Sequence, residues 1–238
     1  MEAFEKFVKQ YDQENKKIIL KYNHSYRVKN VAEYLAKKLN LSEHDIKLAT
    51  IIGFTHDIGR FEQIAKFDTF TDFNSMDHGD YGAQLLFGEG LIKNFWDDAS
   101  DYKIIRKCIE GHNKYALLEC ENDRMLTHLK IIRDADKIDI FNIFANLDEL
   151  DLEFDGVVSS DIKEDFYQNK TARYESIKTN ADSIVSHLSY IFDINFKESL
   201  LYIKEQRLIE NFYNRTKENS ELKEYFLYAK KYLEERVK

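Results

Sequence analysis

Proline is absent from the 238 residues of this chain, and glycine occurs only eight times. Because these two residues end helices and form most tight turns, a chain nearly free of both has few signals for hairpins. Hydrophobic residues make up 43% of the sequence and aromatic residues 14%, which is enough for a packed core and excludes wholesale disorder. The sequence therefore predicts an all-α protein.

Apolar residues recur at helical spacing along most of the chain. In residues 22–39 they lie three and four positions apart, which indicates an amphipathic helix. Ser42, followed three residues later by Asp45, resembles a helix N-cap, and the apolar run after it predicts a buried helix that meets Gly59. Further helices are predicted over residues 75–87, 100–115, 125–147, 183–192 and 198–213.

The charge and hydropathy of the sequence narrow the possible partners. With 35 basic and 43 acidic residues, the formal net charge is -8 at pH 7, which disfavours non-specific binding to duplex nucleic acid. No apolar run approaches the roughly 20 residues that a membrane-spanning helix needs, so no membrane partner is expected. The sequence does not predict an oligomeric state.

The organisation of the chain predicts one helical domain over residues 1–238, with a C-terminal helical extension over 160–238, because no repeat or linker-like segment interrupts it. Glutamate and lysine interrupt the first ten residues, unlike the apolar stretch of a signal peptide. Cys108 and Cys120 have neither a disulfide framework nor the spacing of a zinc site. We expect a cytoplasmic protein with free thiols.

Several histidines and aspartates fall where helical spacing aligns them with apolar neighbours, or lie directly beside such a residue. These six residues are His24, His56, Asp57, His78, His112 and Asp136. A single histidine on an apolar face is more often a hydrogen-bonded core residue, and a single aspartate there could cap a backbone or pair with an arginine. Six such residues would need six separate partners, whereas imidazole and carboxylate groups together are ligands for divalent transition metals. His44, His128 and His187 lack this support and are expected at the surface or in ordinary hydrogen bonds.

The order and surroundings of these residues resemble the HD-domain superfamily of metal-dependent phosphohydrolases, whose motif is H…HD…D. Here the motif residues are His24, the pair His56 and Asp57 within "GFTHDIGRFEQ", and Asp136 within "IIRDADKIDIF". The resemblance covers about residues 23–144, the motif core. Within this superfamily, the chain most resembles the branch that has two more histidines between the HD pair and the last aspartate. The corresponding residues here are His78 in "DHGDYGAQLL" and His112 in "EGHNKY".

This resemblance implies a site for divalent transition metal ions, one or two per chain, from among Mn, Fe, Ni, Co and Zn. One metal would be held by His24, His56, Asp57 and Asp136, and a second by Asp57, His78 and His112. Asp57 would then bridge the two. Such metals would activate a hydroxide and neutralise phosphoryl oxygens. The implied function is hydrolysis of a phosphomonoester or phosphodiester, with a nucleotide or similar small phosphate ester as the partner.

Arg60 stands three residues after Asp57, where many HD enzymes carry a lysine or arginine. Its guanidinium could clamp a phosphate through two parallel hydrogen bonds, so Asp57 and Arg60 are the expected catalytic residues and Arg60 the expected substrate contact. The alternative for Arg60 is a solvated side chain just past a helix end.

A second class of function stays open at this point. Some HD-fold proteins use the same six ligands to hold two irons that activate dioxygen, so a diiron oxygenase acting on a small organic substrate is the alternative. Compared with the HD-GYP phosphodiesterases, Gly111 replaces the first member of a histidine pair and the GYP stretch is missing. These departures disfavour a cyclic-dinucleotide substrate.

Overall fold

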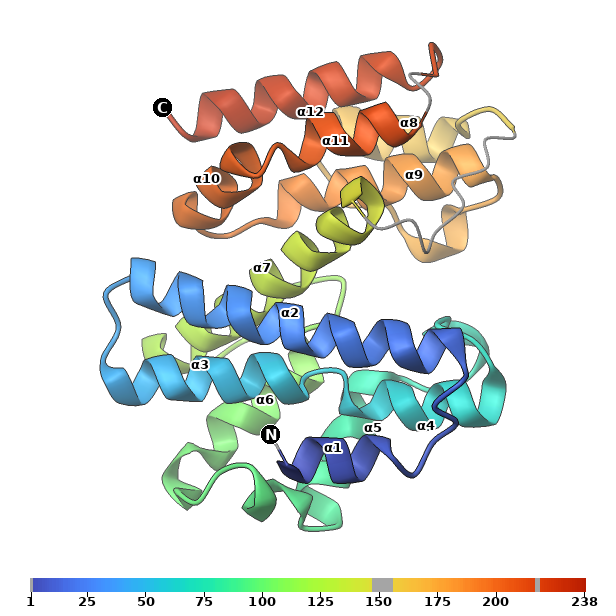
Figure 1. Cartoon of the computed structure of the whole chain (residues 1–238). Coiled ribbons are helices and arrows are strands. Elements are labelled where there is room, and N and C mark those ends of the chain that lie inside the picture. Colours follow the sequence, from blue (N-terminus) through green and yellow to red (C-terminus); the bar gives the residue numbers. More distant parts are fainter. Residues whose placement is uncertain (1, 147–155, 217–218) are drawn as a thin grey trace. The chain divides into compact units, whose positions relative to one another are not determined.

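The computed structural model describes residues 2–146, 156–216 and 219–238 of the chain. Helices and helical turns are the only regular elements in these residues, which confirms the predicted all-α fold (Figure 1). The α-helices are α1 (Glu2–Val8), α2 (Lys16–Lys38), α3 (Glu43–Thr55), α4 (Ile58–Phe67), α5 (His78–Ala83), α6 (Tyr102–Gly111), α7 (Asp123–Asn146), α8 (Ser160–Tyr167), α9 (Asn180–Leu188), α10 (Lys197–Glu205), α11 (Leu208–Arg215) and α12 (Lys223–Arg236).

The chain divides into two compact units, one ending at Asp136 and one beginning at Lys137, so the division falls within α7. All six candidate metal ligands belong to the first unit. The single domain expected from the sequence stays a prediction. Among the described residues, no helix combines the length and the apolar character needed to span a bilayer.

The core of the first unit is built on α2 and α3, which run antiparallel and side by side (Figure 1). Their close approach depends on Gly53, where an added Cβ would lie 2.9 Å from the Cβ of Ala32. Helix α1 closes this core with Phe4, whose ring centroid lies 4.3 Å from that of Phe54 and 5.7 Å from that of Phe61. These aromatic contacts flank the junction between α3 and α4.

The α3–α4 junction differs from the sequence prediction of a helix that meets Gly59. Ser42 caps α3 by accepting a hydrogen bond from the backbone N–H of Asp45, as predicted, but the helix ends at Thr55. Asp57 leaves the helical conformation (φ −99°, ψ 18°), and α4 begins at the next residue. Gly59 therefore lies in the first turn of α4, where an added Cβ would collide with the carbonyl oxygen of His78.

Capping side chains explain two further differences in helix bounds. The predicted helix 75–87 begins only at His78, because Asp77 accepts hydrogen bonds from the backbone N–H groups of the following turn, and it ends in a π-helical turn. The predicted helix 183–192 begins earlier, because Thr179 and Asp182 form a reciprocal capping box. Helix α6 is shorter than the predicted range 100–115, and Leu147, the predicted end of α7, lies outside the described residues.

The predicted helix 198–213 is two helices, α10 and α11. Arg207 between them adopts the left-handed conformation (φ 53°), which ends one helix before the next begins. Both helices bury an apolar face, so the spacing of apolar residues continues across the break. Periodicity alone does not reveal such a break.

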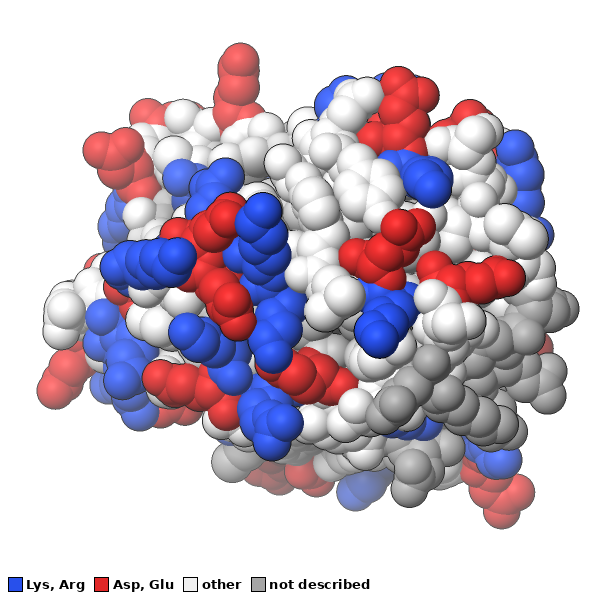
Figure 2. All heavy atoms as spheres, turned by 90° about the horizontal axis from the view of Figure 1, so that it is seen from above, with Lys and Arg blue, Asp and Glu red and all other residues white. Residues whose placement is uncertain are grey.

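The second unit has its own aromatic core. The ring of Phe166 on α8 lies 5.0 Å from that of Phe192, 5.3 Å from that of Tyr225 and 5.8 Å from that of Tyr228. The outer side of α12 is charged, and Lys230 pairs with Glu210 at 3.0 Å. Figure 2 shows basic and acidic side chains interspersed on the face seen from above. Alternating charges of this kind are typical of a solvated helix face.

Candidate metal centre

The structure brings all six candidate ligands into one cluster in the first unit. They are His24 on α2, His56 and Asp57 at the α3–α4 junction, His78 at the first position of α5, His112 directly after α6, and Asp136 on α7. The four histidine side chains are at most 3% exposed. The cluster is thus buried and is assembled from segments far apart in the sequence.

The first half-site consists of His24, His56, Asp136 and the Oδ2 atom of Asp57. The Nε2 atoms of His24 and His56 lie 3.2 Å apart, and they lie 3.4 and 3.6 Å from that Oδ2 atom. Asp136 Oδ1 lies 3.1 Å from Nε2 of His24 and 3.6 Å from Nε2 of His56. Four donor atoms therefore face one another.

The second half-site consists of His78, His112 and the Oδ1 atom of Asp57. The two Nε2 atoms lie 3.0 Å apart, at 3.2 and 3.5 Å from Oδ1. Each oxygen of Asp57 thus faces a different pair of imidazoles. This is the geometry that the sequence resemblance implies for a bridging carboxylate. The ligand atoms of His24, His56 and Asp57 are close enough to share one ion, and so are those of Asp57, His78 and His112, while Asp136 forms such a group with His56 and His112.

The protein orients the imidazoles from their far sides. His56 Nδ1 donates to the carbonyl oxygen of Gly53 at 2.8 Å, and His112 Nδ1 donates to that of Ile109 at 2.8 Å. His78 Nδ1 donates to both carboxylate oxygens of Asp72, at 2.8 and 2.7 Å. Because these acceptors take a hydrogen from Nδ1, each neutral ring keeps its lone pair on Nε2, inside the cluster. The donor set therefore fits divalent transition metals.

The electrostatics of the cluster favour the protonation states that metal binding requires. Burial opposes the charge on Asp57, but the Lys21 ammonium beside it holds the pKa of this carboxyl well below its usual range. Burial lowers the pKa of His112 to about 4, so this imidazole is neutral at pH 7. The cluster thus combines ionised carboxylates with a neutral imidazole before any metal arrives.

Two cations flank the central carboxylate. Lys21 Nζ on α2 donates to Asp57 Oδ2 at 2.6 Å and lies 5.5 Å from the centre of the Phe70 ring. Arg60 Nε lies 3.8 Å from Asp57 Oδ1. Both cationic side chains are 14% exposed, and that of Asp136 is 16% exposed. The cluster is therefore partly accessible to solvent on the side formed by Lys21, Arg60 and Asp136.

Sequence reasoning missed three residues that support the cluster. Lys21 stands three residues before His24, a helical spacing that could have drawn attention to it. Asp72 lies in an irregular segment, where no periodicity indicates the direction of a side chain. Arg133, one turn before Asp136 on α7, is buried and donates to the carbonyl oxygens of Gly111, His112 and Lys114 at 3.1, 3.3 and 2.6 Å. It thereby holds the end of α6 that carries His112.

A separate group of polar side chains in the first unit surrounds Asp101 and Asp45, outside the cluster. His44 Nε2 lies 2.7 Å from Asp101 Oδ2, and His128 Nε2 lies 3.0 Å from Asp45 Oδ1. Asp101 also accepts from Trp96 and Arg124, so its lone pairs are already engaged. We read this group as a hydrogen-bond network rather than a second metal site.

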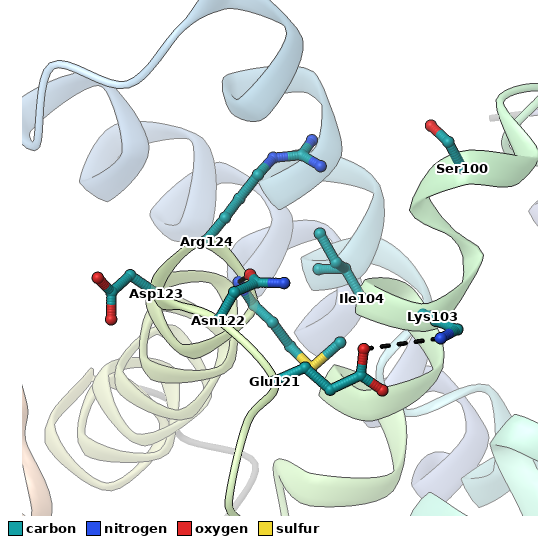
Figure 3. A pocket seen from close by; sticks show the side chains of 8 residues that line it. Ser100, Lys103, Ile104, Glu121, Asn122, Asp123 and Arg124 are labelled. Atoms are coloured by element: carbon teal, nitrogen blue, oxygen red, sulfur yellow. Dashed lines mark hydrogen bonds and ion pairs between the residues drawn. The ribbon is translucent and has the colours of Figure 1, made fainter.

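A surface hollow of about 500 Å³ lies between the beginnings of α6 and α7 (Figure 3). Its lining includes Lys103 and Glu121, which form an ion pair at 3.6 Å. None of the six clustered residues lines it. The hollow is therefore separate from the candidate metal centre.

A helical unit that gathers histidines and carboxylates around one shared aspartate is typical of a metal-dependent enzyme. The HD domain family model matches residues 22–140, half of the chain, and the chain belongs to this family. The predicted resemblance is thereby confirmed. The family indicates the superfamily of metal-dependent hydrolases. No curated protein and no solved structure matches the chain.

Proposed function

We propose that this protein is a two-metal phosphohydrolase that cleaves a small phosphomonoester or phosphodiester. The observation that carries the proposal is the position of Asp57, whose two oxygens face two different sets of imidazole nitrogens. His24, His56, Asp136 and Asp57 would hold one divalent ion, and Asp57, His78 and His112 would hold the other. When bound, the metals supply an activated water and neutralise charge on the phosphoryl group.

The residues of the chain itself provide the rest of the proposed reaction. Lys21 and Arg60 place positive charge on either side of Asp57, where the negative charge of a phosphoryl group would be stabilised. The Nε of Arg60 is buried and has no hydrogen-bond partner among the described residues, so its hydrogen could be donated to a substrate oxygen. Arg60 is therefore the proposed substrate clamp.

Aromatic residues near the cationic side chains support nucleotides as the first substrates to test. The segment between α4 and α5 carries Phe70, whose ring lies beside Lys21, and Phe73, which is 78% exposed. Exposed aromatic faces stack on nucleobases with little sequence preference. A nucleotide would place its phosphate at the cations and its base on such a ring.

The first experiment measures metal content and hydrolysis in the same preparations. We expect the manganese-loaded protein to contain two metals per chain and to hydrolyse, anaerobically, at least one member of a panel of nucleotides, 4-nitrophenyl phosphate and bis(4-nitrophenyl) phosphate. The products would be phosphate or a nucleotide from the nucleotides and 4-nitrophenol from the two model esters. Asp57→Ala should lose both metals and all turnover, because its carboxylate belongs to both half-sites. His187→Phe, which alters a half-buried histidine outside the cluster, is the matched control and should keep both.

The same experiment separates the hydrolase from the diiron oxygenase that the ligand set also allows. A hydrolase uses its metals as Lewis acids, so redox-quiet Mn²⁺ supports turnover without oxygen. A protein that leaves the whole panel intact but consumes dioxygen when loaded with iron and an organic substrate would overturn the phosphohydrolase proposal. Two retained metals in Asp57→Ala would contradict the bridge.

A further inference from the structure

Asp72 lies on the far side of one imidazole of the cluster. It belongs to a short 3₁₀ turn, Asp72–Asn74, in the segment that joins α4 to α5. Its two oxygens accept from His78 Nδ1 at 2.8 and 2.7 Å, while Nε2 of the same ring faces Asp57 and His112. The imidazole of His78 is thus held between Asp72 on one side and the second half-site on the other.

The carboxylate of Asp72 is itself held by side chains from two directions. From α4, Arg60 Nη1 donates to Oδ1 at 2.9 Å and Gln63 Nε2 donates to it at 2.8 Å. From the turn after α6, Asn113 Nδ2 donates to Oδ2 at 3.0 Å. Although Asp72 is 30% exposed, these bonds fix the position of both oxygens.

The two half-sites differ in how much they depend on such support. The first offers four protein donors, whereas the second offers only His78, His112 and one oxygen of Asp57. His112 and His56 are oriented by carbonyl groups of their own helices, but His78 is oriented by the carboxylate of Asp72. A carboxylate behind a ligand histidine fixes the ring and raises its basicity, and its loss commonly costs 10- to 100-fold in metal affinity.

We propose that Asp72 is a positioning residue that determines whether the second metal is held, through its hydrogen bonds to His78. This inference rests on the proposed two-metal site. Asp72 does not contact the substrate or a metal in this role. The first half-site contains no ligand that Asp72 touches, so removing the carboxylate should affect the two metals unequally.

Titration of the metal-free full chain with Mn²⁺ tests whether Asp72 controls binding of the second metal. Elemental analysis counts the bound metal, and electron paramagnetic resonance follows the spin state. Wild type should bind two ions and show the spectrum of a coupled pair. Asp72→Ala should bind the first ion with unchanged affinity and the second about 10- to 100-fold more weakly. Its spectrum at intermediate Mn²⁺ should be that of a single uncoupled ion.

The control is Asp68→Ala, which removes a carboxylate from the same segment. Asp68 pairs with Lys17 at 2.7 Å and, among the described residues, forms no hydrogen bond or ion pair with the cluster, so this variant should bind both ions as wild type does. Asp72→Asn, which nearly conserves volume, covers the case in which the alanine variant fails to fold, and it should also weaken the second ion. An unchanged second affinity in a folded Asp72 variant overturns the positioning role. A wild type that never binds two ions instead overturns the proposed function itself.

Discussion

The guanidinium of Arg60 contacts two different groups of residues. Its Nη1 donates to the Phe70 carbonyl oxygen and to Gln63 Oε1, each at 2.6 Å, and to Asp72. These bonds leave its buried Nε directed toward Asp57 at 3.8 Å. The alternative of a freely solvated arginine is hard to reconcile with this many protein contacts. A phosphate clamp through Nε stays a prediction.

For Arg60→Ala we expect both metals to stay bound, because Asp72 keeps its hydrogen bonds to Gln63, His78 and Asn113. The KM for the phosphate ester should rise by about 10- to 100-fold, which corresponds to the loss of one hydrogen bond to a charged group. Steady-state kinetics with metal analysis of the same sample measures this. Arg60→Lys should recover only part of the loss, since an ammonium lacks the planar fork. Unchanged kinetics would remove Arg60 from the substrate site.

At the scale of elements, the candidate centre depends on how closely α4 approaches α5. Gly59 on α4 lies against the start of α5, and an added Cβ would meet the His78 carbonyl oxygen and come within 2.8 Å of the Gly82 backbone nitrogen. Both of these are backbone atoms, which cannot move as a flexible side chain can. Because His78 is the first residue of α5, any separation of the two helices displaces a candidate ligand.

Gly59→Ala should therefore lower the free energy of unfolding by about 1–3 kcal/mol or more through overpacking, and it should weaken binding of the second metal. Gly88→Ala is the matched control, because an added Cβ there would have only an ordinary contact with Gln84, at 3.5 Å. Urea denaturation of both metal-free variants, followed by Mn²⁺ titration, provides the comparison. Equal stabilities would show that the helices can separate without cost.

At the scale of the whole molecule, a half-buried histidine in the second unit links stability to pH. His187 on α9 lies against Phe144, with ring centroids 4.3 Å apart, and its Nδ1 donates to the Ser183 carbonyl oxygen. Burial lowers the pKa of His187 below its ordinary value. The folded chain therefore takes up the proton less readily than the unfolded chain, whose histidines titrate near 6.5.

The contribution of His187 to stability is thus fully present above the unfolded pKa and is lost as the pH falls through and below about 6.5. We expect the free energy of unfolding of the metal-free protein to decrease from pH 7 to pH 5. His187→Phe, which keeps an aromatic ring beside Phe144 but cannot titrate, should show a smaller decrease. Denaturant unfolding across this pH range measures both slopes. Parallel slopes would mean that His187 does not contribute.

The sequence determined the helical class and the identity of the clustered residues. The absence of proline and the apolar periodicity predicted the helices. The same spacing identified the six clustered residues, because a helix places each residue on a face fixed by its position. These residues are His24, His56, Asp57, His78, His112 and Asp136. The family match confirms the resemblance drawn from those same residues. The cytoplasmic location stays a prediction.

Only the tertiary structure decided how these residues are supported. That each oxygen of Asp57 faces its own pair of imidazoles depends on the break between α3 and α4, which spacing did not reveal. Asp72 reaches His78 from an irregular segment six residues earlier, and Arg133 reaches the end of α6 from the next helix. Such contacts are set by how helices pack and how irregular segments fold back on them. A periodic pattern indicates which face of a helix is buried, but it does not identify the residues that pack against that face.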